Sequence, residues 1–121
     1  MILKDGNSSL SIELSGWDGD AIVVAAVESQ GFSGRADLHV AAQEFRRFCA
    51  ALVRLAKALN GHAQIISAMP GELEINIGPS NGRGYFAVSG HIGDSRSPFW
   101  HAVHFGFEVE YAQIERLSKQ E

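Results

Sequence analysis

The five histidines among the 121 residues are the first candidates for a chemical role. His101 and His104 have the spacing that brings two imidazoles to one metal ion on a helix. Their neighbours alternate with a period of two, which predicts a strand with the two rings on opposite faces. A cluster of His39, His91 and His104 would need adjacent strands in register. We therefore predict no metal site, and we interpret His101, on the apolar side, as a core histidine.

Two carboxylate pairs are the candidates for acid–base catalysis: Glu72 with Glu74, and Glu108 with Glu110. Residues i and i+2 of a strand share a face at about 6.6–6.8 Å, which suits an acid and a base around a water molecule. No flanking apolar pocket would make one carboxyl of a pair the acid and the other the base. We therefore interpret both pairs as solvated acidic stripes.

The single cysteine and the glycine-rich loop also lack the surroundings that catalysis needs. With Cys49 as its single cysteine, the chain cannot form an internal disulfide. Cys49 lies two turns into a predicted helix, which indicates a small buried hydrophobic residue rather than a reactive thiolate. The loop from Gly78 to Gly84 lies between two strands and lacks a P-loop Lys-Ser/Thr, so it predicts a hairpin turn. These residues predict no catalytic group and no cofactor, hence a protein that is not an enzyme.

Composition restricts the class of protein and of partner. Ten basic residues against fourteen acidic ones give a net charge of −4, and hydrophobic residues make up 45%. These values are typical of a globular protein, and this length predicts one domain over residues 1–121. The acidic balance argues against nucleic acid, and no apolar run is long enough for a membrane span. Without a visible secretory signal, we expect a cytoplasmic protein.

Hydrophobic periodicity predicts the elements that position these residues. From Ala42 to Leu59, apolar residues recur at steps of three and four, which predicts a long amphipathic helix that ends at Asn60-Gly61. Its buried stripe is predicted to be Phe45, Phe48, Leu52, Leu55 and Leu59.

Period-two alternation predicts seven strands, three before the helix and four after it. They span residues 8–15, 21–29, 32–40, 62–68, 73–77, 84–92 and 99–109, and a short helix begins at Tyr111. The order βββ-α-ββββ-α predicts an α+β fold. We expect a single twisted antiparallel sheet of about six to seven strands, with the long helix packed on one face and a short C-terminal helix.

The sheet face opposite the helix is the predicted binding site. Trp, Tyr and Arg are the residue types that anchor protein interfaces, and parity places several of them on this face. Arg83, Tyr85 and Trp100 have the composition of a hot spot. The predicted contact residues are Arg35, Asp37, His39, Arg83, Tyr85, His91, Trp100, His104 and Glu108.

Three alternatives to partner binding stay open for this face. It could be an ordinary solvated surface, the buried face of a homodimer or larger homo-oligomer, or an Arg/His/Tyr surface that binds a small molecule or carries out catalysis. The strand from Ala21 to Val27 is apolar on both sides, which favours burial of a second face by self-association.

Turn glycines and core apolar residues form a series of short motifs over residues 8–118. They are Gly31 to Asp37, Glu44-Phe45-x-x-Phe48, Leu52-x-x-Leu55 before Asn60-Gly61, Pro70-Gly71-Glu72-Leu73, Gly84-x-x-x-Val88-x-Gly90 and Phe105-x-Phe107-Glu108. This layout resembles the small bacterial immunity proteins that accompany polymorphic toxins, notably the wall-associated-protein type. The resemblance implies a cytosolic, non-enzymatic inhibitor that binds one toxin domain. The acidic charge is consistent with a basic nuclease toxin as partner.

Overall fold

The computed structural model describes residues 1–80, 83–94 and 100–119. The element order along the chain is ββββ-α-ββββ-α. The elements are β1 (Ile2–Asp5), β2 (Ser8–Asp18), β3 (Asp20–Ser29), β4 (Phe32–Val40), α1 (Ala42–Ala58), β5 (Ala63–Ile66), β6 (Leu73–Pro79), β7 (Tyr85–Asp94), β8 (His101–Glu110) and α2 (Tyr111–Ser118). The α+β class is confirmed. A loop was predicted from Gly93 to Pro98, but Gly93 and Asp94 belong to β7, and residues 95–98 of that loop and the predicted start of the last strand at 99 lie outside the described residues.

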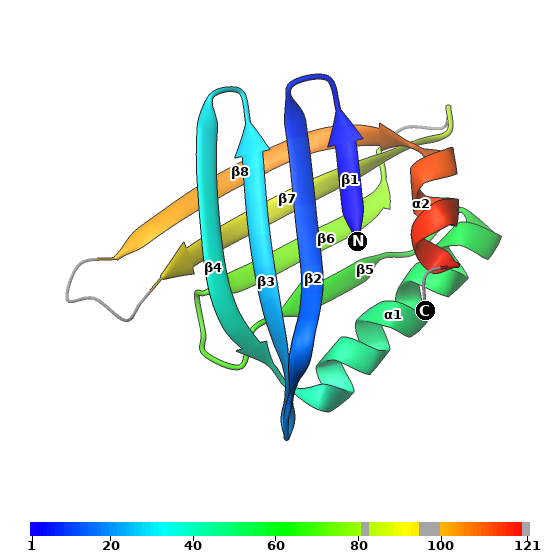
Figure 1. Cartoon of the computed structure of the whole chain (residues 1–121). Coiled ribbons are helices and arrows are strands. Elements are labelled where there is room, and N and C mark those ends of the chain that lie inside the picture. Colours follow the sequence, from blue (N-terminus) through cyan, green and yellow to red (C-terminus); the bar gives the residue numbers. More distant parts are fainter. Residues whose placement is uncertain (81–82, 95–99, 120–121) are drawn as a thin grey trace.

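The eight strands form two antiparallel sheets, not one. Sheet A has the order β1-β2-β3-β4 and sheet B the order β5-β6-β7-β8. Figure 1 shows the strands of sheet A crossing in front of those of sheet B. The predicted single sheet of six to seven strands was wrong because periodicity identifies strands but not their partners. Short turns keep neighbouring strands paired within each sheet, whereas α1 carries the chain from one sheet to the other.

The core lies between the two sheets and against one side of α1. In β3 the residues that face sheet B are fully or almost fully buried, and alternate residues of β6 are buried in the same way. This alternation is the expected pattern for two antiparallel sheets that each cover one face of the other. The largest fully buried side chains include Leu3, Leu10, Val23, Val40, Leu55, Ile65, Ile75, Ile77, Val88, Ile92 and Ile114.

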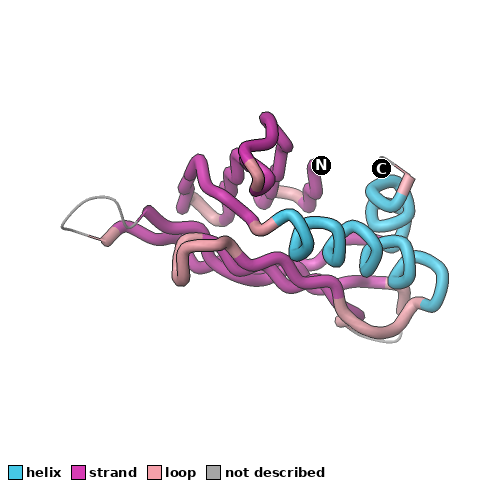
Figure 2. The backbone as a smooth tube through the Cα atoms, turned by 90° about the horizontal axis from the view of Figure 1, so that it is seen from below, coloured by secondary structure: helices cyan, strands magenta, loops and turns pink. Residues whose placement is uncertain are grey.

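The helices lie together at one side of the two sheets (Figure 2). Helix α1 contacts β5, the edge strand of sheet B, and α2. Its position along the side of the sheets differs from the predicted packing across one sheet face. Tyr111 links the two helices by donating from its hydroxyl to the Ala56 carbonyl at 2.9 Å. Among the described residues, neither helix is long and apolar enough to cross a membrane.

The predicted buried stripe of α1 is mostly confirmed. Phe48, Leu52 and Leu55 are buried and Phe45 is partly buried, but Leu59 is 54% exposed. Leu59 is the C-cap residue with φ 58°, and its N–H donates to the Leu55 carbonyl. The left-handed backbone ends the helix one residue earlier than predicted and turns this side chain out of the apolar stripe.

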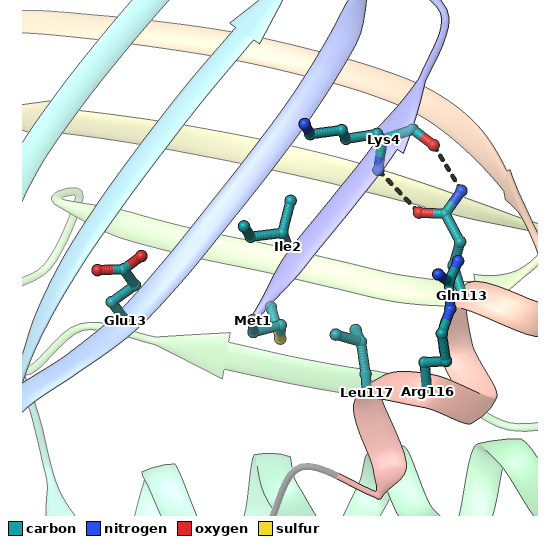
Figure 3. Close-up of a pocket in the computed structure, with 7 residues that line it drawn as sticks. All are labelled: Met1, Ile2, Lys4, Glu13, Gln113, Arg116 and Leu117. Atoms are coloured by element: carbon teal, nitrogen blue, oxygen red, sulfur yellow. Dashed lines mark hydrogen bonds between the residues drawn. The ribbon is translucent and has the colours of Figure 1, made fainter.

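Strand β1 was not predicted, because four residues at the chain start show too little alternation. It pairs with β2, and its other edge is closed by Gln113 of α2. The Lys4 N–H donates to Gln113 Oε1 at 2.8 Å, and Gln113 Nε2 donates to the Lys4 carbonyl at 2.5 Å (Figure 3). We call this pair of bonds the β1–α2 bridge.

Candidate functional site

The nine predicted contact residues lie on two separate surfaces. Arg35, Asp37 and His39 are exposed on β4, on the outer face of sheet A. Since the two sheets face each other across the core, their outer faces point away from each other (Figure 2). The sequence correctly predicted that these residues point outward. It wrongly placed them on the same face as the other six, because the strands form two sheets. The other six belong to sheet B and the segments beside it: Arg83, Tyr85, His91, Trp100, His104 and Glu108.

The centre of the outer face of sheet B is a row of polar side chains. His91 of β7 stands opposite His104 of β8, and their ring centroids are 5.2 Å apart. On its other side His91 stands opposite Glu74 of β6. His39 lies on sheet A and does not reach this row. In the part of the chain that the structure describes, no three His, Cys, Asp or Glu side chains are grouped for a metal ion.

Exposed aromatic residues mark the two ends of this face. Tyr85 begins β7 and is 41% exposed, whereas Trp100 precedes β8 and is 59% exposed. The Trp100 ring packs over the turn at Gly71, where an added Cβ would lie 3.1 Å from the ring. Because β7 and β8 are antiparallel, the two aromatics are about 30 Å apart by strand rise. They therefore do not form the single hot spot with Arg83 that the sequence predicted.

Small residues keep the face shallow between these ends. Ala87, Ser89 and Gly106 occupy outward-facing positions in the middle of β7 and β8. On the neighbouring strands, Gln64 donates to Asn76 at 2.8 Å. A flat, open surface of this kind suits another protein better than a small molecule, because small ligands are bound in concave pockets.

Charge on the sheet B half of the chain is strongly acidic. The described residues from 62 to 110 hold one basic side chain, Arg83, against five acidic ones. Glu108 lies on the outer face and accepts a hydrogen bond from the Ser80 hydroxyl. Helix α1, in contrast, carries four basic residues and one acidic one. The acidic field of sheet B would attract a basic partner.

Two residues that the sequence placed in the core are more accessible than predicted. His101 has the inward parity of β8 but is exposed. It begins β8, which in Figure 1 extends past β4, so sheet A does not cover it. Cys49 is partly buried and lines an apolar hollow of about 310 Å³ with Phe45, Phe48 and Leu52. Alternation along a strand predicts which side of the sheet a residue faces, but not whether the opposite sheet extends far enough to cover it.

A second hollow, of about 470 Å³, lies beside the β1–α2 bridge (Figure 3). Its lining mixes Lys4 and Arg116 with Glu13 and the apolar side chains of Ile2 and Leu117. The Lys4–Gln113 bonds at this hollow join two elements of the fold. The charges of both signs select no particular ligand, and we assign this hollow a structural role.

The comparisons with known proteins give a family for this chain. The model of the Immunity protein WapI-like family matches residues 1–120. No curated protein and no solved structure matched the chain. The family match spans both sheets and both helices, so it covers every element described above. The chain therefore belongs to the WapI-like immunity protein family.

Proposed function

We propose that this protein binds a bacterial toxin domain in the cytoplasm and neutralises it by contact, without catalysis. The observation that carries the proposal is the match to an immunity-protein family over residues 1–120. The outer face of sheet B supports it, since that face is open, shallow and acidic. An inhibitor of this kind needs a surface complementary to the toxin and no catalytic group of its own.

Within that face, Tyr85 and Trp100 are the residues that we expect to dominate the binding energy. Aromatic side chains contribute large contact areas at small entropic cost and are enriched at hot spots. Both are exposed in the free protein, and His91, His104 and Glu108 lie between them. The distance between the two anchors fits an interface of standard size, which buries about 800 Å² on each partner.

The test uses the product of the coding region directly upstream of the gene for this protein, which we expect to contain the toxin domain. We expect the purified protein to bind that domain and to restore growth when the two are co-expressed. Trp100→Ala and Tyr85→Ala should each weaken binding by about 2 kcal/mol or more, the usual hot-spot threshold. Arg35→Ala, on the opposite face, is the matched control and should leave binding unchanged.

Two results would contradict the proposal in different ways. Absence of binding and of growth rescue by the unmodified protein would contradict toxin neutralisation itself. Binding that is lost in Arg35→Ala but kept in the aromatic variants would move the site to sheet A. In each variant, an unchanged circular dichroism spectrum shows that the fold is intact.

A second candidate, self-association through sheet A, is favoured by one observation. The outer side of β3 carries Ile22, Val24 and Ala26, which are partly exposed because no further layer covers them. A homodimer that buries this stripe would explain why β3 is apolar on both sides. Sedimentation at increasing concentration tests this, and Val24→Lys should keep the protein monomeric. A monomer at every concentration would contradict it.

A further inference from the structure

Among the described residues, two of the four sheet edges are covered by other elements, and a third is covered at one end. The edge of β1 is closed by the β1–α2 bridge, and β5 lies against α1. At the end of β4, the His39 carbonyl accepts a bond from the Ala68 N–H at 2.7 Å. The fourth edge belongs to β8, the last strand of sheet B, and none of the described strands pairs with it.

One hydrogen bond shows which backbone groups of β8 face the open edge. The Tyr111 N–H donates to the Gly84 carbonyl at 3.0 Å, one position beyond the Tyr85–Glu110 pair. Hydrogen-bonded and non-bonded pairs alternate in an antiparallel ladder, so the odd-numbered residues of β8 bond to β7. The N–H and C=O groups that point outward belong to Ala102, His104, Gly106, Glu108 and Glu110.

Apart from the charges of Glu108 and Glu110, strand β8 lacks the features that usually protect an edge strand from pairing. Charged side chains, above all lysine, proline, bulges and short length are the common protective features. Strand β8 has ten residues, contains neither Pro nor Lys, and pairs with β7 without a register shift from His101 to Glu110. Strand β2, in contrast, has a register shift between Leu14 and Gly16. The edge of β8 is thus regular enough to pair with a further strand.

Apolar side chains along β8 are also left partly uncovered. On the inner side, Phe105 and Phe107 are only partly buried, with ring centroids 6.2 Å apart. On β7, Val88, which pairs with Phe107, is 0% exposed, and Phe86 on the same face is 2% exposed. One more strand beside β8 would cover this apolar surface in the way that β8 covers that of β7.

We propose that β8 receives an extended strand of the toxin domain, which pairs with its open edge and continues sheet B. This inference rests on the proposed function, because it names how that partner is held. On the outer side the incoming strand would face Glu108 and Glu110, so it carries Lys or Arg there, and it carries apolar residues on the inner side. Main-chain hydrogen bonds supply affinity in this mode, and the alternating side chains supply specificity.

A single strand fits this edge better than a second copy of the protein does. Strands β1, β3 and β4 of sheet A contact β8, and Figure 1 shows the β1–β2 and β3–β4 turns reaching past it. A second copy paired about a twofold axis at Gly106 would bring its own turns into the same space. An isolated strand would instead lie beneath these turns, beside Phe105 and Phe107.

The test compares two substitutions at Gly106, using the product of the coding region directly upstream as the probe. The Gly106 N–H points outward, so Gly106→Pro removes an edge donor without removing a bond to β7. An added Cβ has room, since its nearest neighbour is Ser89 Cβ at 3.7 Å. We expect Gly106→Pro to weaken toxin binding about 10-fold or more, whereas Gly106→Ala should change it less than about 3-fold.

Hydrogen exchange on the unmodified protein provides a second readout that needs no variant to fold. In the complex, the amides of His104, Gly106 and Glu108 should exchange more slowly than in the free protein. Unprotected amides at these positions, or equal binding by the folded Pro and Ala variants, would overturn strand addition while toxin neutralisation stands. A dimer that forms without toxin and is lost in Gly106→Pro would overturn the choice of partner. Absence of toxin binding would overturn both proposals.

Discussion

Sheets A and B have four antiparallel strands each and the same meander order, yet their edges differ. In sheet A, the β1–α2 bridge closes one edge, and a bond from Ala68 to the His39 carbonyl covers the end of the other. In sheet B, α1 lies along β5, but β8 ends the sheet without a covering element among the described residues. Because an exposed strand edge invites unwanted pairing, an uncovered one points to a partner. Under the proposed function, this difference makes sheet B, rather than sheet A, the layer that we expect to bind the partner.

The outer faces of the two sheets also differ in the kinds of side chain that they expose. Sheet A presents the aliphatic side chains of Ile22 and Val24, with charges on the strands beside them. Sheet B presents paired imidazoles and exposed aromatic anchors. Aromatic and polar groups together are typical of interfaces that form and dissociate, whereas aliphatic area is typical of permanent contacts.

The largest expected effect is the loss of the core that both sheets share. Leu52 of α1 is 2% exposed, and Leu52→Ala should lower the free energy of unfolding by about 2–5 kcal/mol. Urea unfolding followed by fluorescence and by circular dichroism should show one coincident transition. Two separate transitions would show that the sheets unfold independently, and an unchanged midpoint would place Leu52 outside the core.

A pair of glycines on neighbouring strands sharpens the contrast between the interior and the edge of sheet B. Gly90 has φ 151°, and an added Cβ would overlap the Glu74 carbonyl oxygen, so Gly90→Ala should cost about 2 kcal/mol or more. Gly106, on the edge strand, has space for a methyl group, and Gly106→Ala should change stability by less than about 0.5 kcal/mol. Equal losses in thermal unfolding would contradict this contrast.

Opening the covered edge of sheet A should have a moderate effect. Gln113→Ala removes both bonds to Lys4, and we expect a loss of about 1 kcal/mol with faster amide exchange in β1. Gln64→Ala is the control, because it removes an exposed side-chain bond that covers no edge. If β1 exchanged equally slowly in both variants, the bridge would not be what protects this edge.

The smallest expected effect concerns the charges of α2. Lys119 Nζ donates to Glu115 Oε1 at 3.1 Å, and this bond is the main cause that lowers the pKa of the Glu115 carboxyl. A carboxyl whose pKa is lowered on folding stabilises the fold above its unfolded pKa, and this contribution is lost as pH falls through the folded pKa. Glu115→Gln should therefore flatten the acid side of the stability profile slightly. The same acid slope in the variant would argue against a role for Glu115.

Local elements were predictable from the sequence, because each depends on nearby residues. The alternation in β4 and the apolar stripe of α1 gave their bounds to within a residue or two and their buried faces. The exposed parity of Tyr85, His104 and Glu108 was likewise correct. Whether any of these residues contacts a partner stays a prediction.

What could not be predicted depends on contacts between distant parts of the chain. Nothing in the alternation of β4 or β5 indicates that they belong to different sheets, so His39 was grouped with His91. The position of Trp100, far from Tyr85, follows from the antiparallel pairing of β7 with β8. The bridge from Lys4 to Gln113 joins residues 109 positions apart, which no short-range pattern reveals.

That separation has a consequence for how the protein is made. During synthesis β1 leaves the ribosome before α2, which carries the residue that closes its edge. At about 5–20 residues per second, sheet A would wait roughly 5–20 s with β1 open before Gln113 is available. A nascent chain held short of α2 would keep both an open β1 and an open β8, and would be prone to aggregation. Completion of α2 therefore covers the edge of β1 and leaves the edge of β8 open.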